Sequence, residues 1–470
     1  MQTVTEPLNA TTYEAGTRPP VRIVHLGLGA FHRAHQAWYT QRAGDGWGIA
    51  AFTGRSPDAA EVLAAQDGLY TLVVRGPDGD SHEVITSVVA AHDGADLAAL
   101  AALVAQAEVA VVTLTVTEAG YKLRPGNAEL DVDDPQVAAD IEALRAHYAK
   151  DFTVGHALGG KVRSATARLV VGLAARRAAD GWPIAVVSCD NLPGNGAAAK
   201  ASVLGFASAV DPLLAKWIVD NVSFVDSSID RITPRTTDED KLAVAEATGY
   251  ADASPVVTEP FASWVLAGDF PGGRPAWESA GAVFVDDLEA FERRKLWLLN
   301  GAHSLMAYAG ALRGHGTISA ALADPVVSGW VEDFWDAAAN HLTDPELDVP
   351  GYRAALRDRF ANPRIAHYLS QIGMDGTLKL AARAVPVFLA ERRAGRDGVA
   401  ALRPIAAWMD RVTEQVSAGE HVQDPAGPRI AIAAGTDDQT PALLALVDQQ
   451  LASELDVVAA LKALRGTFKN

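Results

Sequence analysis

The segment FERRKLWLLNGAHS (291–304) places a carboxylate, an amine, an amide and an imidazole close together in a largely apolar stretch. These groups belong to Glu292, Lys295, Asn300 and His303. On a regular α-helix, which turns by about 100° per residue, all four fall within one arc of roughly 140°. A lysine can take a proton as a general base, and an amide can donate a hydrogen bond to a developing oxyanion. The arc is therefore a candidate catalytic face.

The same arc also has a structural interpretation. A buried polar side chain costs free energy unless it is paired, and these four groups could satisfy one another in a polar seam between domains. Periodicity alone does not separate the seam from the catalytic face, so both interpretations stay open at this point.

A glycine-rich turn follows the first strongly apolar run, VRIVHLGLG (21–29). Glycines at a strand-to-helix turn let the backbone approach a pyrophosphate and present a helix N-terminus to it. The third glycine of the usual fingerprint is replaced by histidine, but the turn lies in the first strand–turn–helix of an alternating pattern, where a dinucleotide site belongs. We expect a dinucleotide here rather than a plain tight turn, held by Gly27, Leu28, Gly29, Ala30, Phe31 and His32.

The second predicted strand (47–54) should end beside the ribose of that dinucleotide. An acidic residue there selects NAD, whereas an arginine can accept the 2′-phosphate of NADP. The sequence has Arg55 directly after the strand, and Asp58 comes later. Arg55 favours NADP, but an exposed arginine after a strand is common without that role, so these residues leave the choice between NAD and NADP open; we name NAD as the expected cofactor and do not exclude NADP.

Two further predicted strands end in polar residues. Ligands of open α/β sheets collect at the carboxyl ends of strands, so Thr115 and Thr117 in TVTEAGY (115–121) are expected to contact the dinucleotide. Asn191 ends the run PIAVVSCDN (183–191) and is a candidate donor to an oxyanion.

Two other residues near strand ends have competing interpretations. Cys189 could be a nucleophile, but no strand-end histidine accompanies it, which favours a small buried filler. Asp230 follows a short strand and is either a substrate contact or part of a surface ion pair with Arg231.

Composition excludes several classes of function. The chain has 470 residues, a formal net charge of −18 and one cysteine. The negative charge argues against nucleic acid and anionic membranes as partners, and a lone cysteine allows no disulfide within the chain and no cysteine-based zinc site. There is no signal-peptide pattern, and no apolar run reaches the roughly 18 residues of a membrane span. We therefore expect a cytoplasmic protein with a small-molecule partner.

The order of predicted elements indicates two domains. Apolar, β-branched runs alternate with helical stretches up to about residue 285, which predicts a doubly wound parallel sheet. Beyond it the patterned stretches have a helical period, among them 288–312, 325–342 and 377–393. The expected fold class is an α/β Rossmann-type domain over 1–285, followed by an all-α substrate and catalytic domain over 286–470.

Other enzyme classes lack their motifs in this chain. The Tyr-x-x-x-Lys pair of short-chain dehydrogenases is absent, as are HExxH and GxSxG. The glycine turn lacks the Lys-Ser/Thr of a P-loop, which counts against a kinase or NTPase. Hydride transfer without a metal is the simplest chemistry that remains.

The motifs together resemble a known family, the polyol-specific long-chain dehydrogenases, which includes mannitol 2-dehydrogenase and fructuronate reductase (D-mannonate oxidoreductase). The similarity runs from about residue 21 to beyond 380, and the spacing K-x4-N-x2-H is specific for this group. It implies a Rossmann-type domain, a helical domain, an active site in the cleft between them, no metal and a monomer. Six segments carry it: GLGAFHRAHQ (27–36), LTVTEAGY (114–121), SCDN (188–191), SSIDRI (227–232), EPFASWV (259–265) and FERRKLWLLNGAHS (291–304).

The resemblance also implies catalytic roles. Lys295 matches the general base of the family, and Asn191 and Asn300 match the pair that hydrogen-bonds the reacting oxygen. Glu292 matches a carboxylate that takes part in proton exchange between the base and solvent. A lysine base working near neutral pH needs a pKa below the usual value of about 10.4; we expect burial and the positive charges of oxidised nicotinamide and of a protonated His303 to lower it.

Substrate contacts are implied at His303, Asp230 and Lys379. Gln371 stands eight residues before Lys379, where mannitol dehydrogenases tend to have arginine, and QIGMDGTLK (371–379) is closer to the fructuronate reductase pattern. This difference weakens the mannitol assignment without replacing it.

The expected function is NAD(P)-dependent interconversion of a secondary alcohol of a polyol and its ketose, such as mannitol and fructose or arabinitol and xylulose. The alternative is a fructuronate reductase, whose sugar-acid substrate needs a cation such as Lys379. A non-catalytic dinucleotide-binding protein is a remote third, because it would be expected to have lost part of the Lys/Asn/His set.

Overall fold

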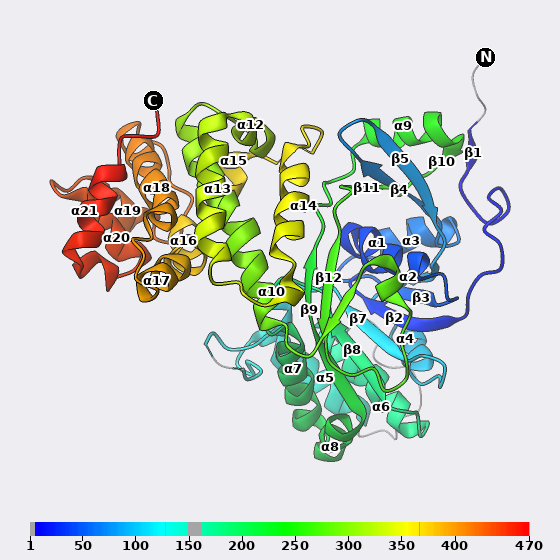
Figure 1. Cartoon of the computed structure of the whole chain (residues 1–470). Coiled ribbons are helices and arrows are strands. Elements are labelled where there is room, and N and C mark those ends of the chain that lie inside the picture. Colours follow the sequence, from blue (N-terminus) through cyan, green and yellow to red (C-terminus); the bar gives the residue numbers. More distant parts are fainter. Residues whose placement is uncertain (1–4, 127, 149–160, 366, 470) are drawn as a thin grey trace. The chain divides into compact units, whose positions relative to one another are not determined.

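The computed structural model describes residues 5–126, 128–148, 161–365 and 367–469. The chain divides into two compact units, Met1–Leu288 and Glu289–Asn470 (Figure 1). The first unit combines sheets with helices, and the named elements of the second are all helical. Both fold classes expected from the sequence, Rossmann-type and all-helical, are thus confirmed.

An eight-stranded sheet forms the centre of the first unit, with the strand order β13-β12-β9-β8-β7-β2-β3-β6. Neighbours from β9 to β6 are parallel, whereas β12 pairs antiparallel with β9. The strands β7 and β8 are nearly continuous apolar runs, as is typical of strands covered on both faces. The strands are β2 (Val21–Leu26), β3 (Gly48–Phe52), β6 (Val88–His92), β7 (Val111–Leu114), β8 (Ile184–Ser188), β9 (Val222–Asp230), β12 (Ser263–Ala267) and β13 (Val283–Val285).

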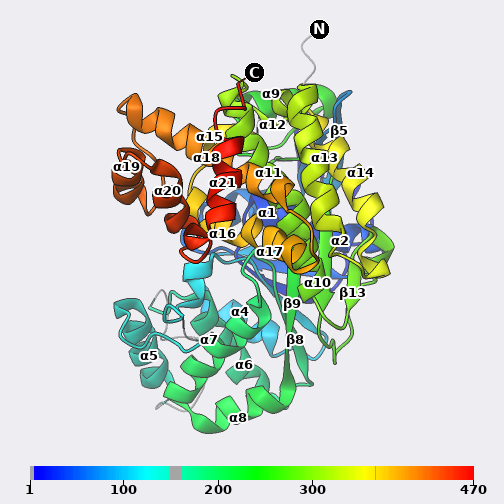
Figure 2. The same ribbon diagram turned by 60° about the vertical axis from the view of Figure 1, so that its left-hand side comes forward.

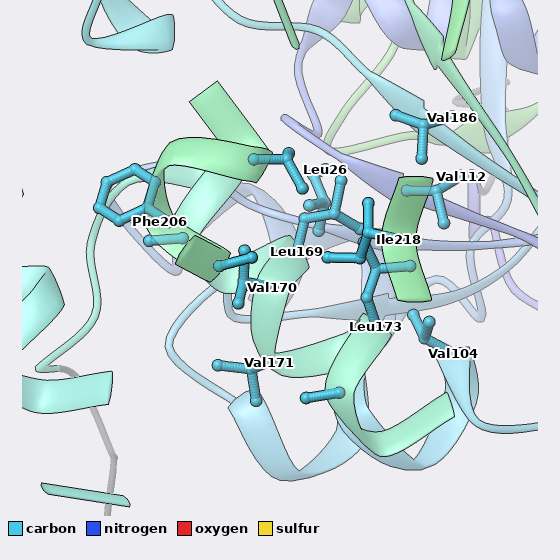
Figure 3. Close-up of a cluster of buried hydrophobic side chains, with 14 of the residues drawn as sticks. Leu26, Val104, Val112, Leu169, Val170, Val171, Leu173, Val186, Phe206 and Ile218 are labelled. Carbon is cyan, nitrogen blue, oxygen red and sulfur yellow. The ribbon is translucent and has the colours of Figure 1, made fainter. Parts of the chain in front are cut away.

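One face of this sheet is covered by helices that pack on the side chains of Leu26, Val112 and Val186 (Figure 3). The apolar helix 165–178 supplies Leu169, Val170 and Leu173 to the same cluster. Figure 2 shows the other helices of this face beside the helix 165–178. The helices of this face are α4 (Leu97–Val104), α5 (Pro135–Tyr148), α6 (Ala165–Ala178), α7 (Asn195–Val210) and α8 (Pro212–Asn221).

The alternate residues of the same strands, such as Ile23 and Ile49, face a second cluster on the opposite side. It contains the fully buried rings of Trp264 and Trp277. Its helices are α1 (Ala30–Ala34), α2 (Gln36–Ala43) and α3 (Asp58–Ala65), with the 3₁₀ turn η2 (Trp277–Ala280). The glycine turn of the sequence therefore leads from β2 into this second layer.

Two small sheets complete the first unit. One has the order β11-β4-β5, and the other pairs β1 (Glu6–Pro7) with β10 (Tyr250–Ala251). The apolar run HEVITSVVAA (82–91) is divided between two sheets at Thr86, whose backbone N–H donates to the Gln41 side chain (2.6 Å). The strands concerned are β4 (Tyr70–Arg75), β5 (Asp80–Ile85) and β11 (Val256–Thr258), with the helix α9 (Asp238–Thr248) beyond them.

The second unit is a helical assembly. Among the residues that the structure describes, no helix is long and apolar enough to span a membrane. After the first helix, its elements are α12 (Ile318–Ala323), α13 (Pro325–Ala339), η5 (Pro345–Leu347), α14 (Val349–Ala361), α15 (Leu369–Ile372), α16 (Gly376–Arg383), α17 (Val385–Arg393), α18 (Val399–Ser417), α19 (Gly427–Ala434), α20 (Gln439–Val447), η6 (Leu451–Ser453) and α21 (Leu455–Leu464).

The first helix of the second unit is not the regular α-helix expected over 288–312. It begins as α10 (Glu289–Arg294), widens into the π-helical segment η3 (Lys295–Gly301), returns to α-helix in α11 (Ala302–Leu305) and widens again in η4 (Met306–Gly310). A π-turn bonds each carbonyl to the fifth residue along rather than the fourth, and such turns are frequent at functional sites. The polar residues of 291–304 therefore lie on a helix with an altered pitch.

Candidate active site

The turn between β2 and α1 is built around Gly27. Its φ of +114° is strained for any residue with a side chain, and a Cβ there would overlap the carbonyl oxygen of Thr115. Gly27 N and Leu28 N both donate to Phe52 O, at 2.9 and 2.8 Å. Gly29 is extended, with φ −150°, and directly precedes α1 at Ala30. The turn thus places backbone without a side chain at the carboxyl edge of the sheet, where a dinucleotide can approach it closely.

His32, in the position of the third glycine, points into the protein. Its ring stacks on His25 of β2, with 3.4 Å between centroids and 9° between planes, and both residues have no exposed surface. His25 Nδ1 lies 2.8 Å from Thr113 Oγ1. Burial lowers the pKa of His25 to about 3 and that of His32 well below its usual value. The two imidazole rings are therefore neutral, and the His32 ring packs in the protein interior against His25.

A pocket of about 380 Å³ opens beside this turn, at the ends of β7 and β8. The hydroxyl oxygen of Thr115 is buried at this edge and has no hydrogen-bond partner among the described residues. An unsatisfied buried hydroxyl and a turn without side-chain bulk together fit a polar ligand such as a dinucleotide. The pocket is lined by Phe31, Thr115, Val116, Thr117, Glu118, Cys189, Asp190, Asn191, Leu192, Pro193 and Ile229. The structure thus brings Thr115, Thr117 and Asn191 together around one cavity.

The backbone beside Asn191 is held by two buried contacts that the sequence did not single out. Asn195 Nδ2 donates to Asp190 O (3.1 Å) and to Ser227 O (2.8 Å), and its Oδ1 accepts from Ser227 N (3.0 Å). The Tyr121 hydroxyl donates to the Asp190 carboxylate, whose other oxygen accepts from Leu192 N at 2.9 Å. These bonds fix both sides of Asn191.

Burial opposes negative charge at the floor of this pocket. Burial raises the pKa of Asp190, although the hydrogen bond from Tyr121 opposes that rise. Burial also raises the pKa of the fully buried Cys189 thiol well above its usual value, and the nearby carboxylate of Asp190 adds to the rise. A protonated, inaccessible thiol is a poor nucleophile, so the chemistry agrees with the packing role expected for Cys189.

At the end of β3, Arg55 is exposed and Thr53 is buried. The loop is braced by Arg168 of α6, whose Nη1 donates to Gly54 O (2.8 Å) and Thr53 O (3.3 Å) while Nε donates to Val162 O (3.1 Å). Arg168 is only 8% exposed. Sequence reasoning missed it, although an arginine within the apolar run ATARLVVGLA (165–174) was an available signal.

Asp230 is the last residue of β9, where it lies opposite Ser263 of β12. The neighbouring Arg231 is buried and donates to the backbone oxygens of Glu259 and Ala34. The sequence left open a surface ion pair between Asp230 and Arg231. Arg231 is not at the surface, and its hydrogen bonds join three segments of the first unit.

In the second unit, η3 changes the geometry of the polar face. A π-turn rotates by about 80° per residue rather than about 100°, so Asn300 falls roughly 40–50° from Lys295 instead of roughly 140°. On this ideal pitch Lys295, Asn300 and His303 would span roughly 90°, a narrower face than a regular helix would give. Lys295, Asn300 and Glu292 are half-buried and His303 is buried.

His303 lies in an apolar and cationic environment. Its ring is 4.8 Å from that of Phe360 and 4.8 Å from that of His367, and its Nε2 has no hydrogen-bond partner among the described residues. Burial, and then the positive charges around it, hold the pKa of His303 well below its usual value. The lowered pKa favours the neutral imidazole, which argues against the positive charge on His303 that was expected from the sequence.

The remaining predicted contacts lie on α15 and α16. Gln371 is exposed on α15. Lys379 is half-buried on α16, its Nζ donating to Ile372 O at 3.1 Å, and burial followed by the charge of Arg383 lowers its pKa. Within the ranges described, no three His, Cys, Asp or Glu residues are grouped as a metal ion would need.

Comparison with known proteins gives matches to both units. Residues 21–279 match the model of the mannitol dehydrogenase Rossmann domain, and residues 287–464 match that of the mannitol dehydrogenase C-terminal domain. These matches confirm the resemblance carried by the sequence motifs.

Individual proteins agree with this result. The chain is 36% identical to the uncharacterized oxidoreductase YeiQ of Escherichia coli, over 90% of this chain and 87% of that protein. It is 37% identical to the D-mannonate oxidoreductase of the same species, over 87% and 83%. A structure of Pseudomonas fluorescens mannitol 2-dehydrogenase in ternary complex with NAD and D-mannitol is 32% identical, with a TM-score of 0.74, over 99% of this chain and 94% of that one.

Proposed function

Because the chain belongs to the mannitol dehydrogenase family of oxidoreductases, we propose that it interconverts a secondary alcohol of a polyol and the corresponding ketose. The observation that carries the proposal is the π-helical pitch of Lys295–Gly301 in the first helix of the second unit, which by its geometry narrows the arc that Lys295, Asn300 and His303 occupy. A structural seam has no need of an amine, an amide and an imidazole with an unsatisfied nitrogen on one face.

We propose NAD as the cofactor, bound by the first unit. The backbone of the Gly27 turn would approach its pyrophosphate, and the unsatisfied Thr115 hydroxyl would bond to it. The dinucleotide supplies the acceptor or donor of hydride. The complex of mannitol 2-dehydrogenase with NAD supports this choice, whereas the exposed Arg55 keeps NADP as the alternative to be tested.

In this proposal Lys295 takes the hydroxyl proton of the alcohol during oxidation, and returns it during reduction. Asn191 and Asn300 donate hydrogen bonds to the oxygen as negative charge develops on it; losing one such donor typically costs roughly 10²–10³ in turnover. His303, being neutral, can bond a substrate hydroxyl through Nε2.

A second candidate, a sugar acid as substrate, is favoured by the charge around His303. Lys379 and Arg383 lie one turn apart on α16, and with Arg359 and His367 they act on His303 as positive charges. Such surroundings favour a ligand that carries a carboxylate. The similarity to D-mannonate oxidoreductase and the exposed Gln371 support the same alternative.

The test is an assay of NADH and NADPH oxidation with fructose, xylulose and fructuronate in parallel, with the Lys295→Ala variant beside the wild type. We expect turnover of a neutral ketose with NADH; a strong preference for fructuronate would instead establish the sugar-acid alternative. Lys295→Ala should lose at least about 10³-fold in kcat while it binds NADH normally. Turnover near the wild-type rate in this variant would refute the proposed role of Lys295.

A further inference from the structure

Two side chains from other helices donate hydrogen bonds to the wide turn that carries Lys295 and Asn300. Trp335 of α13 donates from Nε1 to Leu298 O, at 2.7 Å. Arg383, the last residue of α16, donates from Nη1 to Asn300 O at 3.3 Å and to Ser304 Oγ at 3.1 Å. The bonds to Leu298 O and Asn300 O reach the backbone of η3 rather than its reactive side chains.

A helix that changes between π and α pitch needs such donors. In a π-turn each backbone N–H bonds to the carbonyl five residues earlier, rather than four. At the junction with α-helix, some carbonyls therefore share one N–H donor with a neighbouring carbonyl or have no donor within the helix. A buried carbonyl without a donor is costly. Leu298 O and Asn300 O lie just before the return to α-helix at Ala302, where external donors are most useful.

Gly301 allows the first of these donors to reach the helix. Its φ of −64° is ordinary for a helix, so flexibility does not explain the glycine. A Cβ at this position would lie 2.5 Å from Phe334 Cε1. The glycine thus lets α13 pack closely on η3, and the residue next to Phe334 is Trp335, which is fully buried.

Arg383 provides the second donor from a partly buried position. Burial lowers the pKa of its guanidinium to about 10, which leaves it charged near neutral pH. A charged donor makes a stronger hydrogen bond than a neutral one. Its contact with Asn300 O fixes the backbone of the very residue whose amide is proposed to bond the reacting oxygen.

We propose that Trp335 and Arg383 are positioning residues, which hold the π-turn of η3 and so keep Lys295 and Asn300 on one face. The catalytic consequence of this inference rests on the proposed function, whereas the effect of the two residues on the helix does not. Without these donors η3 would relax toward an α-helix, and Asn300 would rotate away from Lys295 by roughly 90°.

The experiment compares Trp335→Phe and Arg383→Met with Trp277→Phe. Trp277 is a matched control, because it is also fully buried and its Nε1 donates to Thr40 Oγ1 (3.1 Å), but in the first unit. Hydrogen exchange of peptides covering 295–305 reports on the turn, and kcat, KM and the Kd of NADH report on the site. Arg383→Lys, which keeps a charged donor, tests for partial rescue.

We expect exchange in 295–305 to accelerate at least about tenfold in Trp335→Phe and Arg383→Met. We also expect kcat to fall roughly 10- to 100-fold, since a small misplacement of reacting groups has this effect, with the Kd of NADH unchanged. Exchange rates and kcat in both variants within about threefold of those in Trp277→Phe would overturn the inference. If the wild type turned over none of the substrates, the proposed function would fail, and the exchange rates alone would decide whether the two residues hold the turn.

Discussion

Tyr121→Phe removes one hydroxyl from the interior of the first unit and offers a quantitative test of how the pocket is held. The Tyr121 side chain is fully buried, and its hydroxyl donates to the carboxylate of Asp190 beside Asn191. Phenylalanine fills almost the same volume, so the variant loses a hydrogen bond without leaving a large cavity.

The expected cost follows from the kind of bond that is lost. A hydrogen bond to a charged group contributes about 1.5–3 kcal/mol to stability, roughly twice the value for a neutral pair. For a domain of this size each kcal/mol corresponds to about 2–4 °C in Tm. We therefore expect the first unit of Tyr121→Phe to melt several degrees lower near neutral pH, and kcat to fall about tenfold as the backbone of Asn191 loosens.

The penalty should depend on pH with a definite sign. Burial already raises the pKa of Asp190, and the bond from Tyr121 opposes the rise, so the variant raises this pKa further. When the pKa of an acid is higher in the folded state than in the unfolded state, its protonated form stabilises the fold. This contribution to the free energy of unfolding is complete below the unfolded pKa and is lost as the pH rises through the folded pKa. The loss in Tyr121→Phe is thus smallest at acid pH and grows as the pH rises through the raised pKa of Asp190, by about 1.4 kcal/mol per unit of added pKa shift.

Tyr70→Phe is the matched control for this measurement. Tyr70 is also fully buried, but its hydroxyl donates at 2.6 Å to Arg33 O, a backbone carbonyl that does not titrate. Its penalty should stay constant with pH. Thermal unfolding of both variants and the wild type from about pH 4.5 to 8 separates the two cases. A Tyr121→Phe penalty as flat as that of Tyr70→Phe would refute the reasoning.

Two further predictions concern the dinucleotide site. Gly27→Ala should destabilise the first unit by about 3 kcal/mol or more, because its φ of +114° and the Thr115 carbonyl leave no room for a methyl group; Gly29→Ala, at φ −150° with its nearest contact at 3.6 Å, should change Tm little. Arg168→Met should weaken NADH binding about tenfold in a fluorescence titration, with kcat at saturation nearly unchanged, because its donors brace the loop at Gly54. Arg176→Met, which removes a similar buried arginine bonded to Val104 O on the same helix, should leave NADH affinity alone; equal losses in both would contradict a specific role for Arg168.

The fold class could be predicted because its signals are local. Continuous β-branched runs indicated parallel strands, and helical periods indicated the second unit, since burial on two faces or one face leaves these patterns directly in the sequence. The strand-end position of Thr115 and of Asn191 similarly indicated where they would meet, since parallel strands bring their carboxyl ends to one edge. The pocket beside Gly27 has both residues in its lining.

The parts that could not be predicted depend on partners far along the chain. The π-turn over Lys295–Gly301 has no periodic signature in 291–304, because it is held by Trp335 and Arg383, side chains that the segment does not contain. The division of 82–91 into two strands likewise coincides with a hydrogen bond from Thr86 N to Gln41. A helical wheel drawn at constant pitch therefore underestimated how closely the catalytic candidates align.

The two proposed donor amides share one structural feature. In the first unit Asn195 donates to Asp190 O, directly before Asn191, and in the second unit Arg383 donates to Asn300 O. Each bond fixes backbone at or next to the asparagine and does not use its side-chain amide. An amide on a fixed backbone has fewer conformations to lose when it bonds a developing oxyanion, so more of that bond lowers the barrier. The buried donors therefore have a catalytic role in addition to a structural one, which accounts for polar groups at positions where apolar packing would have been simpler.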